Sequence, residues 1–425
     1  MANTADAGTP FCKTPAANNS ASDQARLRER KMGWKGSLIE APLWVAGRLR
    51  PSGIDPRRNA PREILVLRPN DFGDLLTTTP IFEALRRRFP STRLIAGVGR
   101  WGRAVLENNP FVDEIAEIDA PWHNKIIQDQ SLRNALRFIW RSEQVEALRR
   151  QDGFDVGIDV LGSHLGLMLM LRAGVRHRIG VRGYRGGWSG CHAHIEFTPN
   201  IHVARAALAQ AELIGARDLP EARPQLYLTD AERRLATGIW LERTSANQRP
   251  VRLLVGCAAG LPDKSWAPEA MGAALAQIAG SLPESDIILI GGPAEEARAA
   301  QVIAHSGADA GVRSMVGRTS LRTTFALAEQ ADVVITNSSM LLHVAAAFRR
   351  PTVAVLGGTV ANAKGHDVVW GYPAPYSSVG PADAAPGEPA PTWPEVDQVV
   401  RAVLDKVREY VDVRSNAVLS VSGFD

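Results

Sequence analysis

The stretch from residue 64 to residue 89 constrains the fold most, because it reads as a strand, a tight loop and a helix in direct succession. Residues 64–67 form a short apolar run, residues 69–73 break it, and helical spacing then continues until Pro90. A matching strand, loop and helix returns far downstream, at residues 333–349.

Asp74 lies at the joint between this loop and this helix. Its carboxylate can cap the helix by accepting hydrogen bonds from free backbone N–H groups, or it can point across the loop mouth toward a ligand. The matching unit downstream favours the second role.

Apolar runs alternate with helical segments from Pro61 onward, which is the pattern of an α/β fold with doubly wound parallel sheets. The chain has 425 residues and 45% hydrophobic content, and single cores seldom grow past about 250–300 residues, so two domains are expected. We expect a partly disordered basic extension with an amphipathic helix at 1–62, Rossmann-like domains at 63–248 and 249–391, and a C-terminal helix and tail at 392–425.

The expected elements follow from periodicity and from Gly and Pro breaks. The Gly-rich basic segment at 176–197 is expected to be a loop, mobile and anion-attracting or simply solvated, and residues 373–391 are expected to be a linker. Strands are expected at 64–67, 93–96, 114–118, 156–160, 251–255, 287–290, 333–336 and 352–356, and helices at 75–89, 131–150, 203–214, 235–243, 268–281, 294–304, 321–330 and 340–349, with a capping box at 392–395 before the last helix.

Positive charge is concentrated near the N-terminus. Between Gln24 and Arg62 ten basic residues face three acidic ones, whereas the whole chain carries a net charge of +4. The same segment contains Trp34 and Trp44, which suits a helix lying on an anionic membrane surface. The alternative is an arm packed on its own protein or on a partner subunit. No nucleic-acid motif accompanies the charge, so nucleic acid is not an expected partner.

No run of about 18 apolar residues occurs, and residues 1–22 lack an apolar signal core. A cytoplasmic protein is therefore expected, with peripheral attachment to the inner face of the membrane through residues 24–62. The three cysteines are too scattered for a disulfide framework or a four-thiolate zinc site, and the run Cys191-His192-Ala193-His194 has no second cluster to complete a metal site.

Ligands of an open parallel sheet bind beyond the carboxyl ends of its strands, so the loops after the expected strands should share one crevice. Among them, a lysine can meet a phosphate, two glutamates can accept from ribose hydroxyls, and the backbone N–H groups that open the helix at 340–349 offer a site for a diphosphate. The candidates for a donor site are Lys264, Gly291, Gly292, Glu295, Glu296, Asn337, Ser338, Ser339 and His343.

The order of these motifs resembles glycosyltransferase family 9, the heptosyltransferases. The resemblance runs from about Arg62 to about Gly358. It rests on Arg68-Pro69-Asn70-Asp71-Phe72-Gly73-Asp74 with Pro80, on Phe154-Asp155-Val156-Gly157-Ile158-Asp159, on Lys264-Ser265-Trp266 with Pro268 and Glu269, on Ile290-Gly291-Gly292, and on Asn337-Ser338-Ser339 through His343-Val344-Ala345-Ala346-Ala347 with Pro351-Thr352-Val353.

The resemblance implies a two-domain GT-B fold with a central cleft and metal-independent, inverting sugar transfer without a cofactor. It implies an ADP-heptose donor on the C-terminal domain and a glycan or glycolipid acceptor, commonly lipopolysaccharide core, on the N-terminal domain. By position, Asp74 resembles the general base, Lys264 a ligand of the donor diphosphate, and His343 a part of the donor site. Basic residues expected on the acceptor side are Arg68, Arg182 and Arg185.

One departure from the family pattern concerns the donor loop. The family usually has an acidic residue, then Ser or Thr, then Gly, where this chain has Asn337, Ser338 and Ser339. Asn337 can form hydrogen bonds but lacks the charge, and Ser339 removes a flexible glycine. A transferase that uses another nucleotide sugar, or a nucleotide-sugar-binding protein with weakened turnover, is therefore the alternative.

A rival interpretation rests on residues 97–102, which fit the Gly-x-Gly-x-x-Gly dinucleotide fingerprint, with Asp119 at about the expected distance. Taken alone, the fingerprint would indicate an NAD-dependent oxidoreductase. However, it follows the second expected strand instead of the first, and Arg100 and Trp101 would crowd a pyrophosphate.

Overall fold

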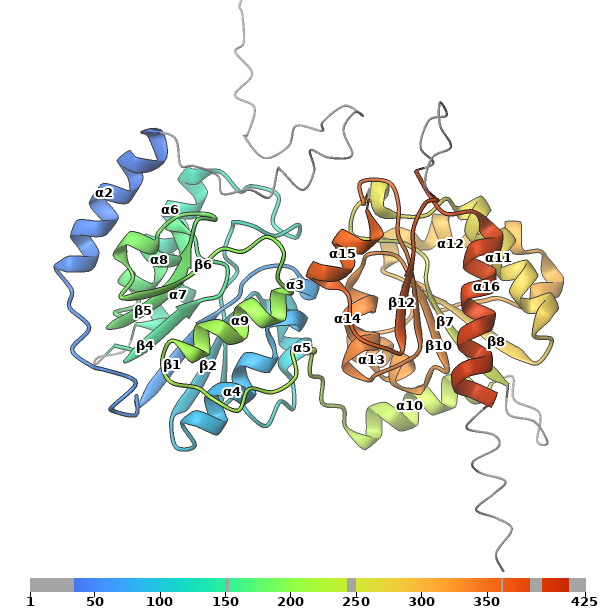
Figure 1. Ribbon diagram of the computed structural model, residues 1–425, viewed down its shortest axis with the longest axis horizontal. Helices are drawn as coiled ribbons and strands as arrows, with labels where there is room; N and C mark the ends of the chain where they lie inside the picture. The colour runs from blue at the N-terminus through green and yellow to red at the C-terminus, as the bar shows by residue number, and fades with distance from the viewer. Residues whose placement is uncertain (1–33, 150–152, 243–249, 361, 383–391, 413–425) are drawn as a thin grey trace, which may run out of the picture.

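The computed structural model describes residues 34–149, 153–242, 250–360, 362–382 and 392–412, and these form two α/β lobes side by side (Figure 1). The predicted domain boundary near 245–250, the second half of the predicted linker, the tail from residue 414 and the first 33 residues lie almost wholly outside the described ranges. No helix within those ranges is long and apolar enough to cross a bilayer.

The N-terminal lobe contains one sheet of six strands, and every neighbouring pair is parallel. The chain enters at the centre, moves outward to one edge and then returns to the other side of its first strand, which creates a switch point between β1 and β4. In spatial order the strands are β3 (Glu114–Glu117), β2 (Arg93–Val98), β1 (Glu63–Leu67), β4 (Val156–Asp159), β5 (His177–Arg182) and β6 (Ala193–Glu196).

The C-terminal lobe repeats this topology with a second parallel six-stranded sheet. Its central strand is β7, so the unit at 333–349 that matches the sequence of the first lobe occupies the place of β4, across the switch point. In spatial order the strands are β9 (Arg313–Ser314), β8 (Ser285–Ile290), β7 (Val251–Gly256), β10 (Val333–Thr336), β11 (Thr352–Val355) and β12 (Tyr376–Val379).

Helices cover both faces of each sheet. Those of the N-terminal lobe are α2 (Trp34–Arg48), α3 (Phe72–Thr78), α4 (Pro80–Arg88), α5 (Arg103–Leu106), α6 (Leu132–Arg141), α7 (Glu143–Leu148), α8 (His164–Arg172) and α9 (Val203–Glu212). The remaining helices are α10 (Asp230–Leu241), α11 (Pro268–Ser281), α12 (Glu296–Ser306), α13 (Leu321–Gln330), α14 (Met340–Ala347), α15 (Ala363–Trp370) and α16 (Val396–Val407), and short 3-10 turns include η2 (Trp188–Gly190) and η3 (Pro262–Lys264).

After Glu63 the central strand β1 is apolar, because residues 64–67 are buried on both faces of the sheet. Ile64 and Val66 pack in one core cluster with α3, α4 and α9, whereas Leu65 and Leu67 pack in another with α6 and α8. Alternation along the strand thus sends successive side chains into different layers. This arrangement holds the loop after β1 at the carboxyl edge of the sheet.

Two predicted helices are each divided in the structure. The helix expected at 75–89 becomes α3 and α4, with the break at Thr79 and Pro80, where proline begins the second helix and needs no N–H partner. The helix expected at 131–150 becomes α6 and α7, and Ser142 ends the first and caps the second through Gln144 N–H.

Several elements were missed. The segment at 176–197, expected to be a loop, contains β5, η2 and β6, and the segment expected to be a linker contains β12. The loop prediction for 176–197 was wrong because charged residues interrupt the apolar pattern of β5. The linker prediction missed β12 because this edge strand, with the sequence YSSV, is largely polar. The helix α15 was not expected, and the capping box of α16 is formed by Glu395 and Gln398 in place of the predicted Thr392 and Glu395.

The helix α2 of the basic extension packs on its own lobe through two buried charges of opposite sign. Arg178 is fully buried and donates hydrogen bonds of 3.0 Å to the carbonyls of Gly47 and Arg50 at the end of α2. Glu40, 7% exposed, accepts from the backbone N–H of Gly187 and from the hydroxyl of Ser189 in the loop around η2. These bonds fix which face of α2 turns outward.

Arg322 of α13 joins the lobes at their base. Its guanidinium forms an ion pair of 2.6 Å with Glu232 of α10, and it also donates to the carbonyls of Tyr227 at 2.6 Å and of Ala104 in α5 at 3.1 Å. Since Arg322 is only 8% exposed, solvent screens these bonds weakly. The relative position of the two carboxyl edges therefore depends on this residue.

We predict that Glu232→Gln lowers the free energy of unfolding at pH 7 by about 1–3 kcal/mol, because the buried Arg322 loses its carboxylate. The hydrogen bond from Arg322 lowers the pKa of Glu232 from 4.5 to about 2. A lowered carboxyl pKa contributes stability above pH 4.5 that is lost as the pH falls toward 2. Urea unfolding of both proteins at pH 7, 5 and 3 should show the difference between them shrinking in acid.

The control for this test is Glu242→Gln, which removes the more exposed partner of Arg313. Its effect should stay below about 1 kcal/mol, as is usual for surface ion pairs. A stability difference between Glu232→Gln and the parent that is the same at all three pH values would contradict the assigned role of this carboxylate.

Candidate functional site

Asp74 lies in the first turn of α3, where Arg68 holds its carboxylate. Arg68 is 7% exposed and donates to Oδ1 of Asp74 over 3.1 Å. Asp74 does not cap α3, because the N-cap position belongs to Asp71. Within the described residues Oδ2 of Asp74 forms no hydrogen bond, and the side chain is 29% exposed. The carboxylate is therefore oriented by one oxygen and open at the other.

The polar residues between Arg68 and Asp74 hold three loops of the N-terminal lobe together. The side-chain amide of Asn70 donates to the backbone carbonyl of His123 over 2.8 Å, and the backbone carbonyl of Asn70 accepts from the indole N–H of Trp101 over 2.7 Å. Asp71 accepts from the backbone N–H of Lys125 over 2.8 Å. The loops after β1, β2 and β3 thus form one connected rim facing the other lobe.

The residues that fit the dinucleotide fingerprint have structural partners within the N-terminal lobe. The ring of Trp101 lies against Gly99, at 2.2 Å from where a β-carbon would stand, so it occupies the space over the glycine. Asp119, the residue expected to bind a ribose, accepts from the backbone N–H and the guanidinium of Arg100. The fingerprint residues bond to one another and to Asn70.

Lys264 is the cation that the C-terminal lobe brings to the cleft. It ends the turn η3, in the loop after β7. Burial lowers its pKa, and repulsion from Lys125 of the other lobe lowers it further, while attraction to Asp263 and Asp74 acts in the opposite direction. Lys264 and Asp74 are thus close enough to affect each other across the lobes.

Of the two glutamates after β8, Glu295 is bonded within its own lobe and Glu296 is exposed. Glu295 accepts from the backbone N–H of Gly292 over 2.6 Å and caps the turn that begins there. A β-carbon at Gly291 would stand 2.3 Å from the same carboxylate, which explains the glycine. Glu296 lies beside Gly317, at 2.6 Å from the place of its missing β-carbon.

In the loop after β10 the asparagine is buried, and the two serines that follow it are partly exposed. Asn337 is fully buried, and its amide donates to the carbonyl of Val355 over 3.2 Å. Ser339, the N-cap of α14, bonds to the hydroxyl of Thr336 over 2.9 Å. Ser338 lies 2.9 Å from Nε2 of His366, a histidine of α15 whose side chain is 6% exposed.

His343 lies at the contact between the two lobes. Its ring stands 3.2 Å from the position of the missing β-carbon of Gly73, and its Nδ1 lies 2.8 Å from the hydroxyl of Tyr372. Burial lowers the pKa of His343 to about 3, so the imidazole is neutral at pH 7. The contact joins the first turn of α3 to the middle of α14, and the two helices lie next to each other between the lobes in Figure 1.

The arginines expected on the acceptor side have different partners. Arg182 pairs with Glu196 over 3.2 Å at the end of β5 and lies over the ring of Trp188. Arg185 lies 3.2 Å from Nδ1 of His123, in the rim loop after β3. Arg185 therefore belongs to the rim, whereas Arg182 joins β5 to β6.

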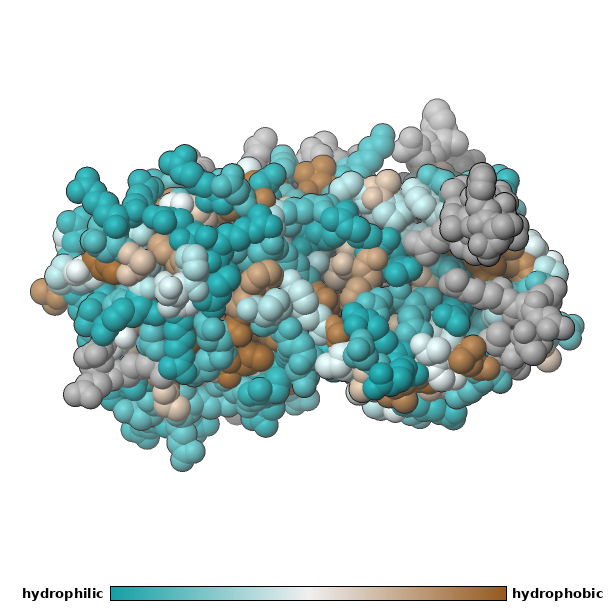
Figure 2. Space-filling view, turned by 90° about the horizontal axis from the view of Figure 1, so that it is seen from below, coloured by the Kyte–Doolittle hydropathy of each residue, from teal (hydrophilic) through white to brown (hydrophobic). Residues whose placement is uncertain are grey.

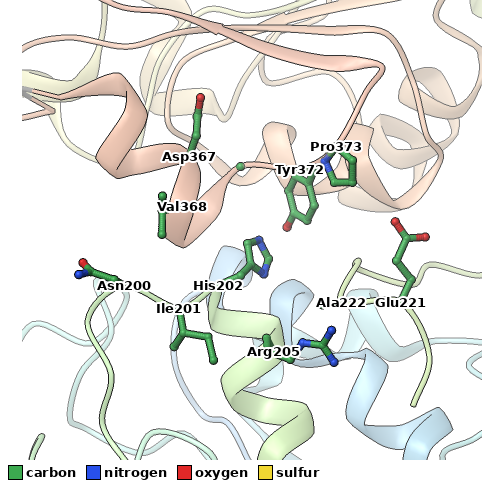
Figure 3. A pocket seen from close by; sticks show the side chains of 11 residues that line it. Asn200, Ile201, His202, Arg205, Glu221, Ala222, Asp367, Val368, Tyr372 and Pro373 are labelled. Carbon is green, nitrogen blue, oxygen red and sulfur yellow. The ribbon is translucent and has the colours of Figure 1, made fainter. Parts of the chain in front are cut away.

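A cavity of about 540 Å³ opens between the lobes beside Tyr372. Figure 3 shows His202 and Arg205 reaching it from α9 and Tyr372 and Pro373 from the segment after α15. His202 contacts Tyr372 edge to face, with ring centroids 5.1 Å apart. Seen from below, the molecule has a notch where the lobes meet (Figure 2).

Sequence reasoning missed Lys125, His366 and Tyr372. Lys125 follows an expected strand, so the rule that ligands bind beyond carboxyl ends could have indicated it. His366 and Tyr372 lie on and just after α15, which was not expected, and no local pattern distinguishes them.

No group of three or more His, Cys, Asp or Glu side chains in the described ranges is placed to hold a metal ion. In the Cys191–His194 run, His192 stacks on His177 with centroids 5.2 Å apart, and burial raises the pKa of the Cys191 thiol. These side chains pack around the buried Arg178.

Comparison with known proteins agrees with this geometry. Residues 142–365, more than half of the chain, match the family described as glycosyltransferase family 9 (heptosyltransferase). Lipopolysaccharide heptosyltransferase 2 of Salmonella typhimurium (strain LT2) is 25% identical over 308 residues, which cover 69% of this chain and 82% of that protein.

Solved structures share the fold. The Escherichia coli ADP-heptose lipopolysaccharide heptosyltransferase II superposes with a TM-score of 0.64 at 20% identity, covering 83% of this chain and 99% of that one. The E. coli heptosyltransferase WaaC with ADP-2-deoxy-2-fluoro heptose gives a TM-score of 0.57 at 18% identity, with coverage of 82% and 99%. The two lobes thus form a GT-B fold, and the chain belongs to glycosyltransferase family 9, the heptosyltransferases.

Proposed function

We propose that this protein transfers heptose from ADP-heptose to a hydroxyl of an acceptor glycan, lipopolysaccharide core or a close relative of it, with inversion and without a metal ion. The observation that carries the proposal is that Asp74 follows Gly73, which contacts His343 of the other lobe, and lies near enough to Lys264 of that lobe to affect its pKa. Relatives named for heptose transfer, one of them solved with a fluorinated ADP-heptose, support the choice of donor.

In the proposed step, the acceptor hydroxyl oxygen attacks the anomeric carbon while Asp74 takes its proton. A bond forms between that oxygen and the anomeric carbon, the bond from the anomeric carbon to the phosphate oxygen breaks, and its electron pair leaves with ADP. A single displacement inverts the configuration. Arg68 fixes one oxygen of Asp74, which leaves the other available to the hydroxyl.

The charge of the departing ADP requires positive potential on the opposite side of the sugar. Lys264 supplies a cation there, and the N–H groups that begin α14 supply the positive end of a helix dipole. Because Asn337 is buried and bonded to Val355, we assign the sugar hydroxyls to Ser338 and its partner His366.

The second candidate is transfer from another nucleotide sugar, or binding with weakened turnover. The observation behind it is that Asn337 replaces the usual carboxylate and is fully buried, so the donor loop offers no charge at that position. Thermal-shift titration with ADP, UDP, GDP and NAD separates these donors, because a ligand that binds only the folded state raises the melting temperature.

We predict that Asp74→Asn lowers the turnover number by about 10²–10⁴-fold while ADP binding changes less than about threefold, because the amide keeps the shape but cannot accept the proton. ADP release is measured with ADP-heptose and core-truncated lipopolysaccharide. Asp230→Asn, which changes an exposed aspartate of α10, should leave turnover unchanged. Full turnover by Asp74→Asn would rule out the assigned base.

We also propose that the enzyme works at the inner face of the membrane and attaches there through α2. The exposed apolar side chains of this segment are Ile39, Trp44 and Val45 of α2 and Leu49 just after it, which are 42%, 47%, 47% and 77% exposed. Arg48 lies over the ring of Trp44, and the sequence on both sides of the helix is basic. Apolar residues flanked by cations suit an anionic lipid surface.

We predict that Trp44→Ser combined with Leu49→Ser weakens binding to vesicles of phosphatidylcholine and phosphatidylglycerol by about tenfold or more, because both apolar contacts with the interface are lost. Vesicle sedimentation measures the effect. The matched control is Leu235→Ser, an exposed leucine of α10. Equal sedimentation of the double variant and the parent, or no binding by the parent, would refute attachment through α2.

A further inference from the structure

Lys125 is a cation that the N-terminal lobe extends to the opposite lobe. It lies in the loop after β3, yet its Nζ stands 2.9 Å from the place where a β-carbon of Gly260 would be. Gly260 belongs to the loop after β7, which also carries Lys264. A side chain at position 260 would therefore meet the amine of Lys125.

The backbone of Lys125 is fixed by a hydrogen bond, whereas its amine is held only by a long ion pair. Its N–H donates to Oδ1 of Asp71 over 2.8 Å, which anchors the residue to the rim. The amine lies 3.9 Å from Oδ2 of the same carboxylate, beyond hydrogen-bond distance, and the side chain is 52% exposed. The ammonium group is thus held near the cleft with its three N–H donors available to a ligand.

Two lysines from opposite lobes consequently face one space. Lys125 repels Lys264 strongly enough to contribute to the lowered pKa of Lys264. Like charges brought together across a cleft cost free energy, which an anion between them would offset. Each of the nearby carboxylates has one oxygen engaged: Oδ1 of Asp71 accepts from the backbone N–H of Lys125, and Oδ1 of Asp74 accepts from Arg68.

We infer that Lys125 is a second cationic ligand of the donor diphosphate and binds its β-phosphate from the N-terminal lobe while Lys264 binds from the C-terminal lobe. This inference rests on the proposed function, since it assumes a nucleoside diphosphate in the cleft. It adds a role for Gly260, whose missing side chain leaves room for the amine. It also makes donor binding depend on both lobes.

Isothermal titration of ADP, AMP and adenosine tests the inference without requiring turnover. Lys125→Met should weaken ADP binding by about tenfold and leave AMP and adenosine within about twofold, because only ADP carries the β-phosphate. Lys125→Arg should restore ADP binding to within about threefold. Lys364→Met, which removes an exposed lysine of α15, is the matched control.

Gly260→Ala provides a second variant that keeps the charge. Its methyl group would press on the amine, which can shift at the end of its flexible side chain, so ADP binding should fall by less than in Lys125→Met, and the double variant should bind ADP no more weakly than Lys125→Met alone. Unchanged ADP binding by Lys125→Met, or an equal loss for ADP, AMP and adenosine, would overturn the inference alone. A parent protein that binds no ADP would overturn the proposed function with it.

Discussion

The close approach of α3 and α14 is the contact on which the arrangement of the site depends. Gly73 has no side chain, so the ring of His343 can pack closely, 3.2 Å from where a β-carbon would project. This contact brings together two helices from different lobes, each of which follows a loop at the carboxyl edge of its sheet. The proposed base, the proposed donor loop and Lys264 are all positioned relative to this contact.

Much of the fold could be predicted from the sequence, because the central strands are largely buried and read as short, mainly apolar runs. The strands expected at 64–67, 156–160, 251–255 and 333–336 are all present. The elements that were missed, such as β5, contain polar residues whose partners lie far away in the sequence. Arg178 interrupts β5 because its guanidinium binds the carbonyls of a segment more than a hundred residues earlier in the chain, and no local pattern reports such a partner.

The site was predictable only in part for a related reason. Asp74, Lys264 and His343 follow strands or begin helices, so their positions relative to the sheets could be inferred. The residues that contact them could not be inferred from the sequence. The bond between Ser338 and His366 depends on how α15 packs, and the approach of Lys125 to Gly260 depends on how the lobes pack. The hydrophobic periodicity of the sequence gives no information about such packing. The burial of Asn337 likewise follows from its bond to β11.

The hydrogen bond between His343 and Tyr372 determines which ring nitrogen of His343 carries the hydrogen. Burial raises the pKa of Tyr372, so its hydroxyl stays protonated at pH 7, and it lies 2.8 Å from Nδ1 of His343. When the hydroxyl donates to Nδ1, the neutral imidazole carries its hydrogen on Nε2, the nitrogen nearer to Gly73, and Nε2 then donates to an oxygen of a bound molecule. When Nδ1 donates to the hydroxyl, Nε2 is an acceptor. The direction of this one hydrogen bond therefore decides whether the imidazole presents a donor or an acceptor to the neighbouring lobe.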